Sequence, residues 1–324
     1  MTYPLKFNTI YKDKIWGGNK IKTLLNKDFG DLPNCGETWE LSALPEDISV
    51  VSNGNWRGQD LKSLIAQNGI AIMGVELYEK FGSHFPLLIK FIDANQDLSI
   101  QVHPDDTLAK KRHQDSGKTE MWYVLQADKQ ANLITGFKKS MSREAYLRKL
   151  ASGDLIEVLN QEQVAAGDVF FLPAGRIHTI GKGILIAEIQ QTSDITYRIH
   201  DFNRTDDQGN KRTLHLEESL DAIDYTYESN YKTNYDQGIN KRVPLVSCPY
   251  FVTNKLNLTH KKVLNAPQVA GFKIYICIEG SAKLVNGEEE TLVVKGETVL
   301  IPAMLSNYEI KTDAEVVLLE TYIE

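Results

Sequence analysis

The stretch AGDVFFLPAGRIHTI (residues 166–180) decides the fold of this chain, because a similar stretch follows near the C-terminus. The second stretch, KGETVLIPAMLSNYEI (295–310), aligns with it without a gap, so that a Gly, an acidic residue and a Pro-Ala pair coincide. Both contain β-branched or aromatic residues punctuated by Gly and Pro, which is typical of short strands. This self-similarity predicts that one structural unit occurs twice.

The similarity extends upstream, where MWYVLQADKQANLITG (121–136) resembles IYICIEGSAKLVNG (274–287). Between its two halves the first unit carries about 24 extra residues, enough for a helix and a loop. We therefore expect a mainly β protein with two copies of one small barrel and helical insertions in the first copy. The polar, Tyr-rich tract 224–246 is expected to link them, so that the predicted domains are 1–235 and 236–324.

Helical patterns are fewer than strand patterns. They occur at 58–67, 105–114, 142–160 and 216–223. The third of these patterns lies within the extra residues of the first unit. We therefore expect that helix to be inserted between two strands of the first barrel.

The composition excludes several classes of protein. With 36 Lys and Arg against 43 Asp and Glu, the net charge of −7 disfavours a nucleic-acid-binding surface. No apolar run approaches the roughly 18 residues of a membrane span, and no secretory signal is visible. The three cysteines are far apart and form no C-x-x-C motif, which suits reduced thiols. We expect a cytoplasmic protein with no nucleic-acid or membrane partner, and the oligomeric state is unknown.

A polar stripe lies on one predicted strand. In LSIQVHPDD (98–106), apolar residues alternate with Ser99, Gln101 and His103, which therefore share one face of the strand. The preceding segment FPLLIKFI (85–92) is almost wholly apolar, so it is expected to be a buried neighbour. A polar stripe in such surroundings is costly unless an ion or a ligand occupies it.

Further polar residues are suited to join this stripe. GKTEMWYVL places Lys118 and Glu120 on one face of a strand, and His178 follows the turn LPAGR. Two His nitrogens, one Glu oxygen and the oxygen of Gln101 form a set that suits Zn²⁺ or another divalent first-row metal. The second unit has Asn307 where the first has His178, so we expect the chemistry in the first barrel only.

The segments SIQVHPDD, GKTEMWYVL, GDVFFLPAGRIHTIG and ILIAEIQQTSDITYRIHDFNR resemble, in this order, the motifs of type I mannose-6-phosphate isomerases. WGG (16–18) and GETWELSA (36–43) are similar to the N-terminal segment of that family, and the chain length fits its short bacterial form. The resemblance implies a pair of cupin-type jelly-roll barrels. It also implies a zinc-dependent aldose–ketose isomerase, which interconverts mannose 6-phosphate and fructose 6-phosphate through an enediolate.

Carried over residue by residue, the resemblance also assigns roles within the site. One zinc ion per chain is expected, and its implied ligands are Gln101, His103, Glu120 and His178. The family's essential arginine falls on Arg198. The base that moves the proton between C2 and C1 stays open between Glu188 and Lys118, which would first have to lose its own proton. Weaker candidates for the base are His84 and Asp194.

The phosphate of the substrate needs a local cationic or hydrogen-bonding site on this acidic protein. Lys90 interrupts the apolar segment FPLLIKFI, where a charge is expensive unless it is paired. We expect Lys90 and Ser99 to bind the phosphate, and Arg198 is a candidate to share this task.

Two other functions are compatible with the same residues. Two His and one carboxylate also suit a cupin Fe(II) oxygenase, although Gln101 would then occupy a position that oxygen needs. The second alternative is a non-catalytic cupin that senses a sugar phosphate. The presence of all four ligands together with Arg198 disfavours this alternative.

Overall fold

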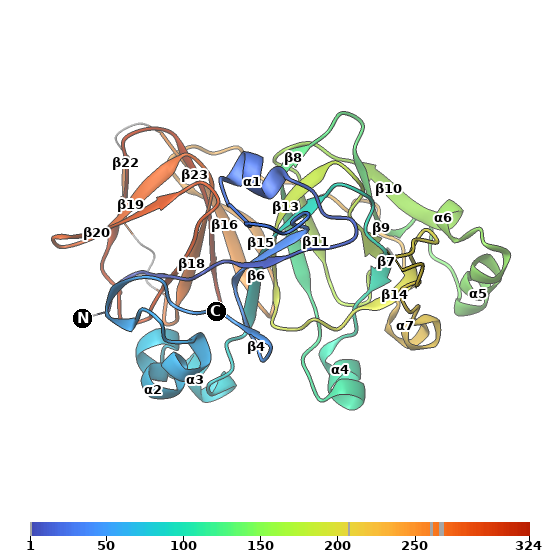
Figure 1. Ribbon diagram of the computed structural model, residues 1–324, viewed down its shortest axis with the longest axis horizontal. Coiled ribbons are helices and arrows are strands. Elements are labelled where there is room, and N and C mark those ends of the chain that lie inside the picture. The colour runs from blue at the N-terminus through green and yellow to red at the C-terminus, as the bar shows by residue number, and fades with distance from the viewer. Residues whose placement is uncertain (1, 207, 260–261, 266–268) are drawn as a thin grey trace.

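The two similar stretches of sequence lie in two separate β-sandwiches, which stand side by side in Figure 1. The computed structural model describes residues 2–206, 208–259, 262–265 and 269–324. The first stretch forms β11 (Val169–Leu172) and β12 (His178–Thr179). The second forms β21 (Thr298–Ile301) and the start of β22 (Glu309–Thr312). The predicted fold class, mainly β with two jelly-roll units of cupin type, is confirmed.

The first sandwich consists of a six-stranded and a five-stranded sheet. In sheet order, the six strands are β11, β8 (Glu120–Ala127), β13 (Ile184–Gln191), β6 (Leu87–Ala94), β3 (Glu37–Leu41) and β2 (Ile10–Lys12). The five strands are β10 (Leu159–Gln163), β9 (Asn132–Phe137), β12, β7 (Ile100–Val102) and β14 (Tyr197–His200). Buried apolar side chains from both sheets, among them Trp122, Leu133 and Phe170, form one core.

The second sandwich consists of a six-stranded and a four-stranded sheet. The six strands are β1 (Leu5–Lys6), β21, β18 (Lys273–Glu279), β23 (Val316–Tyr322), β16 (Val252–Leu258) and β15 (Arg242–Ser247). The four strands are β17 (Lys262–Asn265), β22, β19 (Ser281–Asn286) and β20 (Glu289–Val294). A separate short hairpin pairs β4 (Ala43–Leu44) with β5 (Asp47–Ile48).

The N-terminal strand β1 crosses between the two units. It pairs with β21, so that Leu5 lies opposite Leu300 in the second sandwich. Residues 5–6 thus lie within the predicted first domain by sequence but extend a sheet of the second. The boundary between 235 and 236 stays a prediction.

The two six-stranded sheets pack against each other through their outer faces. Because side chains alternate along a strand, Trp122 of β8 faces the first sandwich, whereas Met121 and Tyr123 face the second. In β18, Tyr275 faces its own sandwich and Ile274 joins the shared core. Strands buried on both faces must be apolar on both, which explains why FPLLIKFI is nearly free of polar residues.

Helices cover the ends and the outer faces of the sandwiches. They are α1 (Lys20–Leu25), the 3-10 turn Gly54–Trp56, α2 (Leu61–Met73), α3 (Val75–Phe81), α4 (Asp106–His113), α5 (Arg143–Ser152), α6 (Leu155–Val158) and α7 (Leu216–Ala222). In Figure 1, α5, α6 and α7 lie at the end of the first sandwich, away from the second. No described helix is long and apolar enough to cross a membrane.

The prediction of a single helix over 142–160 is wrong for the second half of that range. The helix α5 ends at Ser152, because Gly153 adopts a left-handed conformation with φ of 81° and closes it as a C-cap. The chain then forms the short helix α6 and enters β10 at Leu159. Buried Leu155 and Leu159 pack under the five-stranded sheet, so tertiary packing overrides the helical pattern there.

The predicted linker over 224–246 lies along the first sandwich. Tyr231 is buried, and its hydroxyl donates to the carbonyl of Phe137 over 3.0 Å. Lys232 forms an ion pair of 2.8 Å with Asp168. From Arg242 onward the same tract already belongs to β15. The segment is therefore an ordered connection with its own tertiary contacts.

Candidate metal centre

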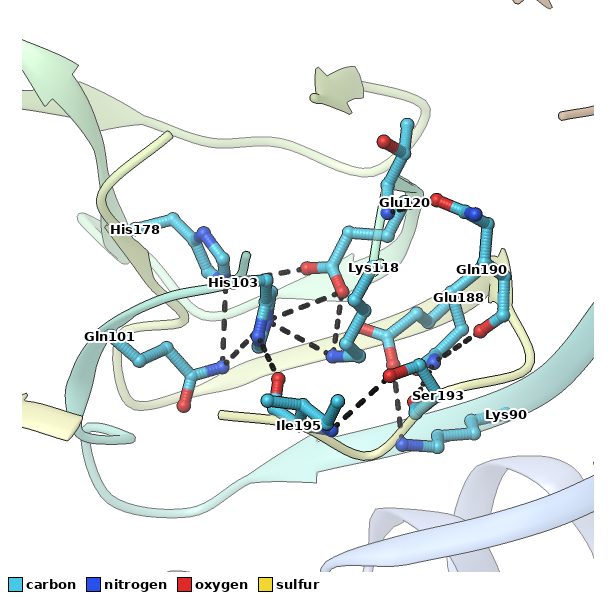
Figure 2. A network of polar contacts seen from close by, with 12 residues as sticks. Lys90, Gln101, His103, Lys118, Glu120, His178, Glu188, Gln190, Ser193 and Ile195 are labelled. Carbon is cyan, nitrogen blue, oxygen red and sulfur yellow. Dashed lines mark hydrogen bonds and ion pairs between the residues drawn. The ribbon is translucent and has the colours of Figure 1, made fainter. Parts of the chain in front are cut away.

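Four polar side chains of the first sandwich converge on one point, as Figure 2 shows. Gln101 lies on β7, His103 follows that strand, Glu120 begins β8 and His178 begins β12. The antiparallel pairing of β12 with β7 sets His178 directly opposite Gln101. One ligand atom each from His103, Glu120 and His178 lies within 4.8 Å of the other two. The strand register thus brings together residues that are far apart in the sequence.

Both histidines turn an unprotonated nitrogen toward this point. His103 Nδ1 donates to the carbonyl of Ile195 over 2.8 Å, and His178 Nδ1 donates to the carbonyl of Arg176 over 2.9 Å. With the proton held on Nδ1, each Nε2 keeps its lone pair. Burial and the nearby Lys118 ammonium lower the pKa of His103 well below its ordinary value, and they lower that of His178 to about 4. Neutral imidazoles are the form that binds a metal ion.

Glu120 is fully buried, yet neither of its carboxylate oxygens accepts a hydrogen bond from a described residue. Lys118 Nζ lies 2.8 Å from Oε2 as an ion pair and 3.1 Å from His103 Nε2. Lys118 thus compensates Oε2, whereas Oε1 is buried without a hydrogen-bond partner among the described residues. Buried carboxylate oxygens usually have such partners, so Oε1 indicates that a metal cation completes the site. Two imidazole nitrogens and a carboxylate fit Zn²⁺ or a similar divalent ion.

Gln101 lies at the edge of this group. Its Nε2 is 3.3 Å from His178 Nε2 and 3.5 Å from His103 Nε2, while its Oε1 is 3.4 Å from Ser99 Oγ. To act as a ligand, the amide must turn over so that Oε1 faces the histidines. A half-turn about the last side-chain bond exchanges the two atoms and leaves the remaining side chain in place.

A second layer of buried charges lies beside the candidate ligands. Lys90 Nζ is 3.6 Å from Glu188 Oε1 and 3.8 Å from Glu37 Oε2. Trp122 Nε1 donates to Glu188 Oε2 over 2.8 Å. Burial and repulsion by Glu120 raise the pKa of Glu188, so this carboxylate holds a proton more tightly than an exposed one. Burial opposes ionisation of Glu37, but Lys90 and other cations outweigh it and lower its pKa to about 2.

A cavity of about 260 Å³ opens onto this group. Its polar lining includes Ser99, Gln101, Lys118, His178 and Glu188, together with Lys14, Glu37, Lys90, Asp194, Arg198 and Arg212. The structure therefore brings both proposed phosphate ligands and all three proposed catalytic residues to one cavity. His84 lines a different cavity, next to Pro249 and Tyr250, which separates it from the other candidates for the base.

Arg198 is held mainly by backbone contacts. Its Nη1 donates to the carbonyl of Thr213 over 2.9 Å, and its backbone nitrogen donates to His215 Nδ1 over 3.1 Å. Its buried Nε has no hydrogen-bond partner among the described residues. This leaves part of the guanidinium available to a ligand in the cavity.

Three charged residues of the cavity lining carry no role predicted from the sequence, namely Lys14, Glu37 and Arg212. Glu37 lies in the quoted segment GETWELSA, two positions before Trp39, and strand alternation could have indicated their shared face. Lys14 and Arg212 lie outside regular elements, in segments whose path only tertiary structure determines.

The second sandwich holds a different polar group at the corresponding place. Glu120 pairs with Leu172, and Lys273 pairs with Ile301; each partner directly precedes one of the two matched prolines. Lys273 therefore occupies the position of the candidate ligand Glu120. Within the described ranges, His103, Glu120 and His178 form the one cluster of three such potential ligands.

Glu320 is the counterpart of Glu188 in the second sandwich, because they pair with Tyr275 and Trp122 respectively. Glu320 is fully buried and accepts hydrogen bonds from Tyr275 Oη over 2.7 Å and from Arg242 Nε over 2.8 Å. The positive charge of Arg242 thus compensates the negative charge of this carboxylate.

Fold and site together define a class, namely two-domain cupin proteins with a candidate metal centre in one domain. Comparison with known families narrows this class. The description "Phosphomannose isomerase type I, catalytic domain" matches residues 5–140, and "Mannose-6-phosphate isomerase, cupin domain" matches residues 242–320. The chain belongs to the type I mannose-6-phosphate isomerase family, which confirms the resemblance seen in the sequence.

Individual relatives match over nearly the full length. The chain is 38% identical over 326 aligned residues to the mannose-6-phosphate isomerase of Streptococcus mutans, covering 98% of each chain. It is 35% identical to the mannose-6-phosphate isomerase ManA of Bacillus subtilis, covering 97% of this chain and 98% of that one. The crystal structure of a Bacillus subtilis mannose 6-phosphate isomerase superposes with a TM-score of 0.90 at 30% identity and covers all of both chains.

Proposed function

We propose that this protein interconverts mannose 6-phosphate and fructose 6-phosphate and uses one Zn²⁺ per chain. The observation that carries the proposal is the convergence of two unprotonated Nε2 atoms on a buried carboxylate. This carboxylate forms an ion pair with Lys118 but accepts no hydrogen bond from a described residue. Family membership supplies the substrate class. It also favours the isomerase over an Fe(II) oxygenase or a sensing protein on the same scaffold.

In this proposal the ion is held by Gln101, His103, Glu120 and His178. A divalent ion at such a site polarises carbonyl and hydroxyl oxygens, and this stabilises the negative charge of an enediolate. The carbonyls of Ile195 and Arg176 keep both imidazoles in the tautomer that leaves Nε2 free.

Glu188 is the base that we favour. It would take the proton from C2 of the open-chain aldose and return it to C1. In the same conversion the hydroxyl proton of O2 would pass to O1, so that no net proton is gained or lost. A carboxylate with a raised pKa suits this exchange, because it accepts the proton more readily than an exposed carboxylate does. Trp122 orients it through the bond from Nε1. Lys118 would donate a hydrogen bond to a substrate oxygen beside Glu120.

The remaining cations would bind the phosphate and stabilise charge. Ser99 and Lys90 line the cavity, as a phosphate site requires, although Lys90 already lies between two carboxylates. Arg198 would share the task through the part of its guanidinium that no described residue contacts. Arg212 and Lys14 add positive charge to the same lining. We further infer a cytoplasmic location, where Cys35, Cys248 and Cys277, all unpaired, would stay reduced.

The test starts from protein stripped of metal by a chelator. Fructose 6-phosphate formation from mannose 6-phosphate should be absent and should return with one equivalent of Zn²⁺. The variants Gln101→Ala and His178→Ala should lose both bound zinc and turnover. His113→Ala, which removes a histidine of α4 outside the cavity, is the matched control and should keep both. Zinc-dependent turnover that survives the loss of either ligand would refute the ligand assignment, and zinc binding without turnover would refute the reaction.

A further inference from the structure

Two adjacent acids in the motif HPDD have different tasks. Asp105 is the N-cap of α4, where its side chain accepts a hydrogen bond from the nitrogen of Leu108 over 2.8 Å. Asp106 caps nothing and instead turns toward three other segments. Its Oδ1 accepts from the backbone nitrogen of Gly117 over 2.8 Å and from Gln191 Nε2 over 3.0 Å. One carboxylate thus joins the start of α4 to the loop before β8 and to the end of β13.

These contacts flank Lys118 on both sides. Gly117 is bound by Asp106, and the backbone nitrogen of Thr119 donates to Gln191 Oε1 over 2.9 Å. A Cβ atom at position 117 would lie 2.5 Å from the backbone nitrogen of Asp106, so only glycine permits this close approach. The next residue after Thr119 is the candidate ligand Glu120, whose backbone direction is set by the same bonds.

The third donor to Asp106 comes from the second domain. Tyr250 lies in the turn between β15 and β16, and its hydroxyl donates to Asp106 Oδ2 over 2.8 Å. Burial and the Asp106 carboxylate raise the pKa of Tyr250 to about 12, so its hydroxyl keeps the proton that forms this bond. The bond links the second sandwich to the loop that carries Lys118.

We propose that Tyr250 and Asp106 are positioning residues, through which the second domain holds Lys118 and Glu120 in place. The inference rests on the proposed function, because it concerns the same site. Neither residue lines the 260 Å³ cavity, whereas both line the cavity that also contains His84. Their effect must therefore pass through the backbone at 117–119. The second cupin unit is then a necessary brace for the catalytic loop, although its described residues contain no cluster of three potential metal ligands.

The experiment compares the full-length zinc-loaded protein with Tyr250→Phe, Asp106→Ala and the double variant. Each is assayed for kcat and KM with mannose 6-phosphate, and for the half-life of bound zinc against excess chelator. Asp106→Ala leaves the N-cap Asp105 intact. Tyr227→Phe, which removes the hydroxyl of an exposed tyrosine elsewhere, is the matched control. Urea unfolding of every variant reports whether the fold itself is affected.

We expect Tyr250→Phe to lower kcat about tenfold and to shorten the half-life of bound zinc about tenfold, relative to the parent protein. This is the effect of losing a residue that orients metal ligands. KM should stay within about twofold of the parent value. Because Tyr250 acts on the loop through its bond to Asp106, the double variant should lose no more than Asp106→Ala alone. Additive losses, or a Tyr250→Phe enzyme equal to Tyr227→Phe in kcat and zinc retention, would overturn the inference. If Asp106→Ala does not fold, the Tyr250→Phe comparison decides. If the parent protein binds zinc but lacks turnover, the proposed function fails, while zinc retention still tests the positioning.

Discussion

Replacing Glu188 by Gln should remove most of the turnover and leave the fold intact. Glutamine has nearly the same shape, and its side-chain oxygen can still accept the hydrogen bond that Trp122 Nε1 donates over 2.8 Å. The substitution removes only the charge and the ability to take a proton. It therefore separates a base from a residue that merely supports its neighbours.

The contacts of Glu188 give the expected magnitudes. Lys90 loses the carboxylate of Glu188 at 3.6 Å but keeps that of Glu37 at 3.8 Å. The buried ammonium of Lys90 therefore stays paired, and its charge and that of Glu37 cancel. The free energy of unfolding should then change by less than about 1 kcal/mol. Loss of a general base should lower kcat by about 10²–10⁴-fold, which corresponds to roughly 2.7–5.4 kcal/mol in the activation free energy.

The assay measures kcat and KM with mannose 6-phosphate at saturating zinc, together with urea unfolding of the same preparation. Glu157→Gln, in an exposed ion pair with Lys149, is the matched control and should behave like the parent. A Glu188→Gln enzyme whose kcat falls by less than tenfold would refute the base assignment. In that case the role of the base would pass to Lys118, the other candidate.

Two further predictions concern stability. Arg242→Met removes the ion pair of the fully buried Glu320 and leaves uncharged hydrogen-bond donors such as Tyr275. It should lower the free energy of unfolding in urea by about 3–5 kcal/mol. Adding Glu320→Leu should recover most of that loss, whereas an unchanged single variant would contradict the reasoning. In metal-free protein, burial lowers the pKa of His178 from 6.5 to about 4. At a pH between these two values, His178 therefore binds a proton in the unfolded chain but not in the folded one. Stability should therefore fall as pH drops from 6.5 to 4, by up to about 1.4 kcal/mol per pH unit. Urea midpoints at pH 7 and pH 5, compared with those of His178→Gln, test this, and identical pH dependence in the two proteins would count against it.

The duplication and the polar stripe were readable because both depend on short-range patterns. The matched prolines keep their spacing from the preceding strands, and alternation puts Ser99 and Gln101 on one face whatever the rest of the fold does. The roles of these residues stay predictions, although the structure brings three of the four expected ligands, His103, Glu120 and His178, within reach of one ion.

Other features depended on contacts that no local pattern contains. The helical pattern over 142–160 continues past Gly153, yet α5 ends there because packing under the sheet favours the short helix α6 followed by the strand β10. The sequence predicted Lys90 as a phosphate ligand but could not indicate the two buried carboxylates, from different strands, that flank it. Asp106 directly follows the N-cap Asp105 in the sequence, but its hydrogen-bond partners are 11, 85 and 144 residues away.

From the sequence alone, a duplicated β unit and a set of candidate metal ligands in its first copy could be predicted. This was possible because strand periodicity and ligand type are properties of single segments. Tertiary structure alone decided which charges lie beside the ligands, and which contact joins the second domain to the loop of Lys118. These contacts depend on the strand register and on the packing of the two sandwiches, because both bring together residues that are distant in the sequence. The free energy of burying a charge then depends on which partners it finds there.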